Sequence, residues 1–161
     1  AKKAAEYGIH LMYHNHDFEF VRLANGKYGF DDLYDRIPAE LLYAEIDTCW
    51  VNVAGEDPSG YVRRYKGRVP ILHLKDFVMP GKKPAHLYSL IGLKDEKSTS
   101  GEEAFSFRPV GYGVQNIPAI LDAATDADCR WVVVEQDEAA LGKTSLECAA
   151  LSVNYLKNLY K

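Results

Sequence analysis

The chain has 161 residues and a formal net charge of −4 at pH 7; 47% of its residues are hydrophobic and 26% are charged. This length allows one domain with a sizeable core, and the composition is typical of a soluble globular protein. The mild acidic balance argues against a nucleic-acid-binding surface, which needs a basic stripe. No apolar run approaches the ~18 residues of a membrane span, nothing resembles a signal peptide, and the three cysteines lack CxxC spacing. We therefore expect a cytoplasmic protein without nucleic-acid or membrane partners.

The first residues, AKKAAEYGI, contain no initiator Met and read as the last turns of a helix that Gly8 closes. A chain that opens inside a helix suggests a fragment of a longer protein. A frayed or processed terminus is the alternative interpretation.

Four short apolar runs, rich in β-branched and aromatic residues, predict four strands. The strands are expected near residues 9–15, 41–47, 69–76 and 130–137. Each run is followed by a loop and then by a segment with helical periodicity. The helical segments are residues 30–37, 58–67, 114–127 and 143–161. Because strand and helix alternate four times, we expect parallel strands in an α/β layer fold.

Two of the helical segments carry boundary signals. Pro58 stands where it can open the second helix, and Thr144 or Ser145 followed by Glu147 is a capping signal for the last one. In that last helix we expect one apolar face, formed by Leu146, Ala149, Ala150, Val153, Leu156 and Leu159.

The connection after the third strand, residues 77–113, is unusually long. Loops of this length are usually functional lids or disordered segments. We expect an ordered glycine turn at PVGYG, residues 109–113, and a mobile tip at KDEKSTSGEE, residues 94–103. The chain has no GxGxxG or Walker A sequence, which excludes phosphate-binding loops of those types.

Ionisable residues gather at the carboxyl ends of all four predicted strands. Side chains alternate between the two faces of a strand, so residues two positions apart share a face. With a suitable choice of face for each strand, all of these ionisable residues lie on the same side of the sheet. These residues are His14 and His16, Glu45 and Asp47, His73 and Lys75, and Glu135 and Asp137. Active sites of parallel α/β folds, and of barrels especially, form at this edge.

These residues predict a metal site, although each one has a simpler explanation. A single strand-end Asp or His is more often a cap or a loop hydrogen-bond partner, and Lys75 with Asp76 could be a solvated ion pair. Four successive strands that end in charge are costly to bury, and a divalent cation removes that cost. Two carboxylates with one or two imidazoles are a normal ligand set for Mn²⁺, Co²⁺ or Zn²⁺.

Five motifs, read in order, resemble the sugar phosphate isomerase/epimerase family, whose members have the xylose isomerase-like TIM barrel. They are YHNHDFEF at 13–20, EIDT at 45–48, HLKD at 73–76, PVGYG at 109–113 and VVVEQD at 132–137. The resemblance covers nearly the whole chain. It implies that residues 1–161 form a single domain, the C-terminal half of the barrel with its strands five to eight. Four strands cannot close a barrel, so a missing N-terminal half or self-association is also implied.

The resemblance also implies a divalent metal and names its ligands. Asp47, His73 and Glu135 match three ligands of the family, and the fourth ligand position falls on His14, where many relatives have Glu. An imidazole at that position favours Mn, Co or Zn over Mg. His16 matches a histidine that usually faces the substrate.

The sequence departs from the family pattern at two positions. In the family, the first and fourth Glu are thought to act as the acid–base pair, and His14 breaks that pair. Glu19, in the following loop, and His16 are the candidates to replace the lost carboxylate. Trp50 stands where several epimerases have a substrate-binding His, so we expect it to line the substrate site or to pack in the core.

The reaction that the resemblance implies is isomerisation or epimerisation of a sugar or sugar phosphate. It proceeds by proton abstraction next to a carbonyl, with stabilisation of the enediolate. Glu135 is the expected general base, with His16 or Glu19 on the opposite side of the substrate. Lys75 is expected either to pair with an oxyanion or phosphate of the substrate, or to be only a salt-bridge partner of Glu45 or Asp137.

Three other functions remain open at this point. A keto-inositol dehydratase shares the first step of the reaction and the same fold. A non-catalytic half-barrel fragment is the second alternative. An apurinic endonuclease of this barrel is disfavoured, because it needs several metals and a basic surface.

Overall fold

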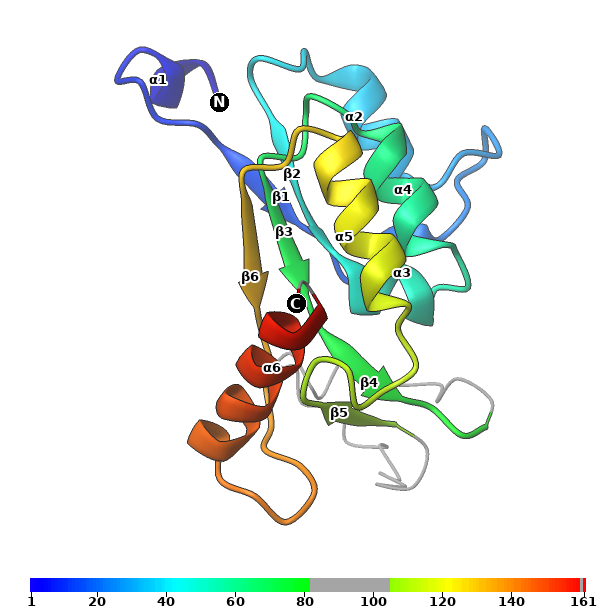
Figure 1. Ribbon diagram of the computed structural model, residues 1–161. Helices are drawn as coiled ribbons and strands as arrows, with labels where there is room; N and C mark the ends of the chain where they lie inside the picture. The colour runs from blue at the N-terminus through cyan, green and yellow to red at the C-terminus, as the bar shows by residue number, and fades with distance from the viewer. Residues whose placement is uncertain (82–104, 160) are drawn as a thin grey trace. The chain divides into compact units, whose positions relative to one another are not determined.

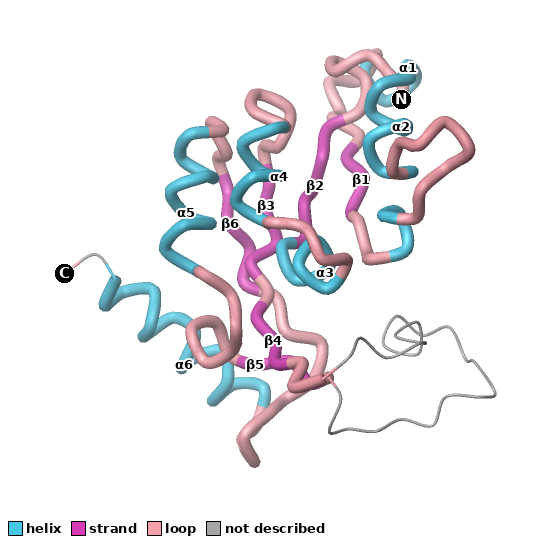
Figure 2. The backbone as a smooth tube through the Cα atoms, turned by 90° about the vertical axis from the view of Figure 1, so that its right-hand side faces the viewer, coloured by secondary structure: helices cyan, strands magenta, loops and turns pink. Residues whose placement is uncertain are grey.

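The computed structural model describes residues 1–81, 105–159 and 161. They form two compact units that alternate along the chain. The first unit contains Ala1–Leu74 and Asn116–Val133, and the second contains Val134–Lys161 and the described part of Lys75–Gln115. Figures 1 and 2 show the elements of each unit.

A parallel sheet forms the centre of the first unit. Its strands, in spatial order, are β1 (Met12–His14), β2 (Tyr43–Asp47), β3 (Ile71–Leu74) and β6 (Trp131–Val134), whose last residue begins the second unit. The pairs β1–β2 and β2–β3 are parallel, and their register places His14 beside Glu45 and Asp47 beside His73. The carboxyl ends of these three strands therefore meet at one edge. All four predicted strands are present, but each is shorter than its apolar run because the ends of the runs lie outside the ladder.

Helices cover one face of this sheet, where α4 and α5 lie side by side in both views (Figures 1 and 2) and ring contacts of Phe30 with Tyr61 and Tyr65 place α2 beside α4. The helices of the first unit are α1 (Lys2–Ala5), the 3-10 helix η1 (Phe18–Phe20), α2 (Gly29–Arg36), α3 (Thr48–Val53), α4 (Pro58–Arg64) and α5 (Ile117–Asp126). Pro58 opens α4 as predicted, behind the capping carboxylate of Asp57. The sequence pattern does not predict α3, which begins directly after β2 because the side chain of Asp47 caps it.

An aromatic cluster packs α2 against α4. The ring of Phe30 lies 4.8 Å from that of Tyr34, 5.5 Å from Phe20, 5.2 Å from Tyr65 and 6.0 Å from Tyr61. All five side chains are at least nine-tenths buried. Burial of each contributes roughly 1.5–3 kcal/mol to stability. The cluster therefore holds α2 against α4, and the Tyr34 hydroxyl ties it to the sheet by donating to the carbonyl oxygens of Tyr13 and Tyr43.

Two antiparallel strands in the second unit replace part of the predicted long loop. They are β4 (Asp76–Val78) and β5 (Ser106–Arg108), and Phe77 pairs with Phe107. The prediction of one continuous loop over 77–113 is therefore wrong at residues 77–78 and 106–108, which pair in a ladder. The predicted mobile tip at 94–103 lies outside the described residues.

The predicted glycine turn at 109–113 is confirmed, and Asp76 organises it. The fully buried Asp76 carboxylate accepts hydrogen bonds from the backbone N–H groups of Gly111, Gly113, Gln115 and Phe77, at 2.9–3.1 Å. A Cβ at Gly113 would overlap Asp76 Oδ1 and the Phe77 carbonyl oxygen, so only glycine fits there. Asp76 is thus an internal anchor, which corrects the expectation of a solvated ion pair.

Helix α6 (Ser145–Leu159) closes the second unit, and its predicted capping signal is confirmed. Oε2 of Glu147 accepts from the backbone N–H of Thr144 at 2.8 Å, and the Glu147 N–H donates to Oγ1 of Thr144 at 3.3 Å. This reciprocal pair is a capping box with Thr144 as the N-cap. None of the described helices has the length and apolar character needed to cross a membrane.

The predicted apolar face of α6 is wrong in part. The buried residues are Cys148 and Ser152, whereas Leu146 is 81% exposed and Val153 is 44% exposed. The buried face of α6 is instead set by hydrogen bonds of Ser152. Its Oγ accepts from the Val110 N–H at 2.9 Å and donates to the Cys148 carbonyl at 3.1 Å. These hydrogen bonds, rather than the apolar stripe, turn the helix toward the rest of its unit.

Candidate metal centre

Three predicted ligands of the first unit converge at the carboxyl edge of its sheet. His14 ends β1, Asp47 ends β2, and His73 is the penultimate residue of β3. Each offers one donor atom, and these atoms lie within 4.8 Å of one another. Nε2 of His14 is 3.3 Å from Oδ2 of Asp47, and the ring centres of His14 and His73 are 4.6 Å apart. Parallel pairing of adjacent strands brings together residues that are far apart in sequence.

This donor set fits a divalent transition metal. Two imidazole nitrogens and one carboxylate oxygen suit Zn²⁺, Mn²⁺ or Co²⁺ better than Mg²⁺. Donors on opposite sides of an ion with bonds of about 2.1 Å are themselves up to ~4 Å apart. The observed spacing of up to 4.8 Å therefore needs only a small closure around an ion.

Asp47 is held in place by both its side chain and its backbone. Oδ1 accepts from the Cys49 N–H at 2.8 Å and from the Trp50 N–H at 3.4 Å, which caps helix α3. The Asp47 N–H donates to Oδ1 of Asn15 at 3.0 Å, and Nδ2 of Asn15 donates back to the Asp47 carbonyl at 3.4 Å. The amide of Asn15 thus extends the β1–β2 pairing by one step beyond the ladder. The carboxylate is fully buried, with one oxygen committed to the cap and the other facing His14.

His73 is held by a second acidic residue of β2. Its Nε2 lies 2.6 Å from Oε1 of Glu45, and its carbonyl oxygen accepts from Oγ1 of Thr48 at 3.0 Å. Glu45 precedes Asp47 by two residues and so shares its face of the strand. Glu45 is thus a partner of His73 within the first unit.

Glu19 holds the loop that carries His16. Oε2 of Glu19 accepts from the His16 N–H at 2.9 Å, and Oε1 accepts from the Tyr13 hydroxyl at 2.7 Å. The residue is 8% exposed. Burial and the hydrogen bond to Glu19 raise the pKa of Tyr13 to about 12. Both carboxylate oxygens of Glu19 are therefore engaged, one with the loop backbone and the other with strand β1.

His16 lies among aromatic rings close to the three ligands. Its ring is stacked on Phe18 at 5.5 Å and lies 5.1 Å from His14 and 5.7 Å from Trp50. Trp50 is 1% exposed, so its indole packs in the core beside His16 instead of forming an open wall. Phe77 is also 1% exposed and belongs to the second unit.

The second unit contains its own charged cluster around Lys75. Nζ of Lys75 lies 3.1 Å from Oε2 of Glu135 and 3.1 Å from Oδ2 of Asp137, and 5.4 Å from the centre of the Phe107 ring. The lysine is 2% exposed, which again corrects the solvated-pair expectation. Of the two expectations for Lys75, the salt bridge to Asp137 is present, with Glu135 as a second partner.

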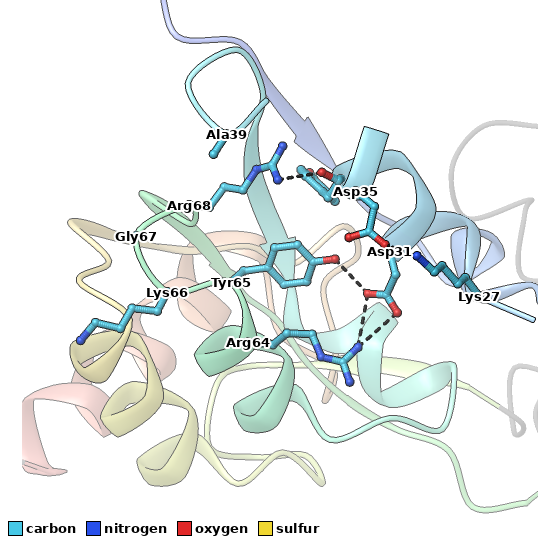
Figure 3. A pocket seen from close by; sticks show the side chains of 10 residues that line it. Lys27, Asp31, Asp35, Ala39, Arg64, Tyr65, Lys66, Gly67 and Arg68 are labelled. Carbon is cyan, nitrogen blue, oxygen red and sulfur yellow. Dashed lines mark hydrogen bonds and ion pairs between the residues drawn. The ribbon is translucent and has the colours of Figure 1, made fainter. Parts of the chain in front are cut away.

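A cavity of about 500 Å³ is lined by residues of α2 and of the end of α4, and by none of the three ligands (Figure 3). Its cations are paired: Arg64 with Asp31, Lys27 with Asp35, and Lys66 with Asp128. Arg68 donates to three backbone carbonyls, those of Tyr34, Ile37 and Leu42. Arg68 thereby compensates the partial negative charge at the carboxyl end of α2. The charged residues around this cavity therefore stabilise the fold, and we assign no binding role to them.

Sequence reasoning missed the supporting roles of Asn15 and Glu45. Asn15 stands between the two histidines of YHNHDFEF, and only the register of β1 against β2 reveals that its amide faces Asp47. The period-two pattern does place Glu45 on the ligand face, which was the available signal. Its partner could not be identified without the register of β2 against β3.

A family model and several similar proteins match this chain. The family described as "Xylose isomerase-like TIM barrel" matches residues 1–158. An inosose dehydratase of Lacticaseibacillus casei is 25% identical over 158 residues, which are 96% of this chain and 49% of that protein. An inosose dehydratase 2 of Bacillus cereus is 27% identical over 141 residues, which are 85% of this chain and 43% of that protein.

A solved structure has the same fold. A sugar phosphate isomerase/epimerase from Parabacteroides distasonis superposes with a TM-score of 0.70 at 23% identity, over 97% of this chain and 47% of that one. The chain thus spans about half the length of the curated relatives that it matches. The expected fold is confirmed: 161 residues form part of a xylose isomerase-like TIM barrel.

Proposed function

Because the chain belongs to the xylose isomerase-like TIM barrel family, we propose that it is part of a metal-dependent isomerase or epimerase for a small sugar or sugar phosphate. The observation that carries the proposal is the convergence of His14, Asp47 and His73 at the carboxyl ends of three adjacent strands. In barrels of this kind the chemistry lies at those ends.

The proposed metal ligands are His14, Asp47, His73 and Glu135. Glu135 follows β6 directly, and β6 is the neighbour of β3 in the sheet order. When bound, a divalent cation supplies Lewis-acid polarisation of the substrate's carbonyl and neighbouring hydroxyl oxygens. Zn, Mn or Co is the proposed ion, since two of the ligands are imidazoles.

Glu135 is the proposed general base. It removes the proton from the carbon next to the substrate carbonyl, while a protonated His16 delivers a proton to the opposite face. Lys75 holds Oε2 of Glu135 at 3.1 Å and so fixes the direction of that carboxylate. Glu19 is the weaker candidate for the second acid–base group, because its oxygens hold the His16 backbone and the Tyr13 hydroxyl.

Dehydration of a keto-inositol is the second candidate reaction. The observation in its favour is that curated relatives matching 85–96% of this chain carry the name inosose dehydratase. The first step, removal of a proton next to a carbonyl, is the same. The reactions differ afterwards, because dehydration expels the β-hydroxyl as water whereas epimerisation returns a proton to carbon.

A working site also requires the rest of a barrel. A closed (β/α)8 barrel takes about 250 residues, and this chain supplies four parallel strands. We propose that the remainder comes from an N-terminal half or from a second copy of the chain. A non-catalytic half-barrel is the outcome if neither is available.

The first test is the metal content of the purified chain, measured by elemental analysis together with its mass in solution. We expect about one Zn, Mn or Co per chain, lost in a His73→Ala variant. His10→Ala is the matched control, because His10 is an exposed histidine ahead of β1 and should leave metal content unchanged. A metal-free wild-type chain, or equal loss in both variants, would contradict the proposed site.

The second test separates the two reactions. The metal-loaded chain is incubated in deuterium oxide with ketopentoses, ketohexoses, their phosphates and an inosose. Deuterium incorporation with a change of configuration or with conversion of the ketose to an aldose supports epimerisation or isomerisation, and loss of one water from the inosose supports dehydration. Neither reaction, in protein that binds metal, would assign the chain to the non-catalytic class.

A further inference from the structure

We infer that Glu45 is a positioning residue that fixes the tautomer of His73, so that Nδ1 of this ring, and not Nε2, faces the metal. This inference rests on the proposed function, because it concerns the same metal centre. It adds a residue that is absent from the proposed ligand set. It also specifies which nitrogen of His73 binds.

The first argument is the distance between the two side chains. Nε2 of His73 lies 2.6 Å from Oε1 of Glu45, which is short hydrogen-bond distance. An ionised carboxylate has acceptors only, so the shared hydrogen belongs to the ring nitrogen. A neutral imidazole with its hydrogen on Nε2 carries its lone pair on Nδ1. Only Nδ1 is then able to bind a cation.

The second argument is the placement of Glu45 within the sheet. It lies beside Ile71 in the β2–β3 register, two residues before His73, while Asp47 lies beside His73 itself. Glu45 therefore lies on the same face as the ligands, two residues closer to the amino end of the strand. From that position it can hold the His73 ring without occupying a ligand position, while Thr48 fixes the His73 carbonyl.

The third argument is the known effect of such a pair on a metal ligand. Histidine ligands generally donate their second N–H to a carboxylate or carbonyl, which orients the ring and raises its basicity. Loss of that partner typically lowers metal affinity by about 10–100-fold. Glu45 lies within hydrogen-bond distance of His73, so we assign this effect to it.

The test combines a tautomer measurement with metal affinity. Long-range ¹H–¹⁵N spectra of histidine-labelled protein, with and without Zn²⁺, report which ring nitrogen carries hydrogen and which binds. We expect Nε2–H in the metal-free protein and Zn²⁺ on Nδ1 of His73. A His73→Ala spectrum assigns the signals.

Variants of Glu45 separate positioning from simple packing. We expect Glu45→Ala to lower Zn²⁺ affinity by about 10–100-fold. Glu45→Gln should retain affinity within a few-fold, since its amide oxygen still accepts from Nε2. Glu40→Ala, which removes an exposed carboxylate ahead of β2, is the control and should have no effect. Thermal unfolding of each variant shows whether the fold is kept.

Two results would overturn the inference: Zn²⁺ on Nε2 of His73, or wild-type affinity in folded Glu45→Ala. These differ from failure of the proposed function, which is the absence of Zn²⁺ binding by the wild-type chain. In that case the metal-free spectrum still decides the role of Glu45. Nε2–H in wild type and its loss in Glu45→Ala would support positioning, and the Nδ1–H tautomer in wild type would refute it.

Discussion

Oδ2 of Asp47 lies 3.3 Å from Nε2 of His14, while Oδ1 of the same carboxylate caps helix α3. One side chain thus links the start of a helix to the candidate metal centre. Because the cap fixes Oδ1, the direction of Oδ2 is set by the backbone of α3. The two tasks can be separated by substitution.

We predict that Asp47→Asn abolishes metal binding but largely keeps the stability of the fold. An asparagine oxygen can still cap α3, whereas its NH₂ group cannot act as a metal ligand. Asp47→Ala should abolish binding and also lose about 1 kcal/mol of unfolding free energy from the cap. Metal analysis and urea unfolding measure the two effects.

The control for this pair is Asp57→Asn, because Asp57 also caps a helix, α4, although it uses one carboxylate oxygen for each of the two backbone N–H groups. It should leave metal content unchanged. Full metal binding by Asp47→Asn would show that this carboxylate serves only as a cap.

The second prediction concerns alkaline pH and Tyr13. Burial, followed by the hydrogen bond to Glu19, raises the pKa of Tyr13 from 10.0 to about 12. A group whose pKa is raised on folding contributes stability that is complete below its unfolded pKa and is lost as pH rises through its folded pKa. Tyr13 should therefore stabilise the fold up to about pH 10 and lose that contribution between pH 10 and 12.

Tyrosinate absorbance, compared between wild type and Tyr13→Phe, measures this titration. In Glu19→Gln the pKa of Tyr13 should fall but remain above 10.0, because burial is the larger cause. An unchanged pKa in that variant would mean that the Tyr13–Glu19 hydrogen bond is absent in solution.

The third prediction concerns Asp76, which we expect to be essential to the glycine turn. Asp76→Asn replaces one of two acceptor oxygens by a donor, so two of the four backbone N–H groups lose their acceptor. Hydrogen bonds to charged groups contribute about 1.5–3 kcal/mol each, so the variant should lose at least about 2 kcal/mol. Chemical denaturation tests this, with the exposed Asp122→Asn as control. An unfolding free energy of Asp76→Asn equal to that of the wild type would refute the anchoring role.

The alternation of apolar runs and helical segments was sufficient to predict four parallel strands and the helices α2, α4, α5 and α6. It was also sufficient to place three of the candidate ligands together at the strand ends, since period-two patterning puts His14, Asp47 and His73 on one side. Register was not predictable from one sequence, because it depends on which residues of different strands pair. For that reason the contacts of Asn15 and Glu45 appear only in the structure.

The remaining misses have local causes. Helix α3 was hidden because its residues, TCWVNV, are β-branched or aromatic for the most part, while a side-chain cap from Asp47 starts the helix. Lys75 and Asp76 looked solvated because charged residues usually are. The sequence contains no direct signal that Lys75 meets two carboxylates or that Asp76 meets four backbone amides.

The last prediction is that the chain on its own self-associates through the open edges of its sheet. Strands β1 and β6 are the outer strands in the described sheet. Trp131 on β6 is 68% exposed, and it helps to line a cavity of about 510 Å³ together with Met12, Tyr43 and Ile71. An unpaired edge with exposed apolar side chains is a template for pairing with another chain.

Sedimentation should therefore give a mass above the 18.1 kDa of one chain. Trp131→Lys should shift the protein toward monomer, because a charge on an edge strand opposes strand pairing. Leu23→Lys is the control: Leu23 is also exposed and apolar, but it lies in the loop before α2 and should not change the mass. A monodisperse wild-type monomer would instead mean that the edges are protected within one chain. Metal binding by such a monomer would show that the three ligands of β1, β2 and β3 do not need a completed barrel.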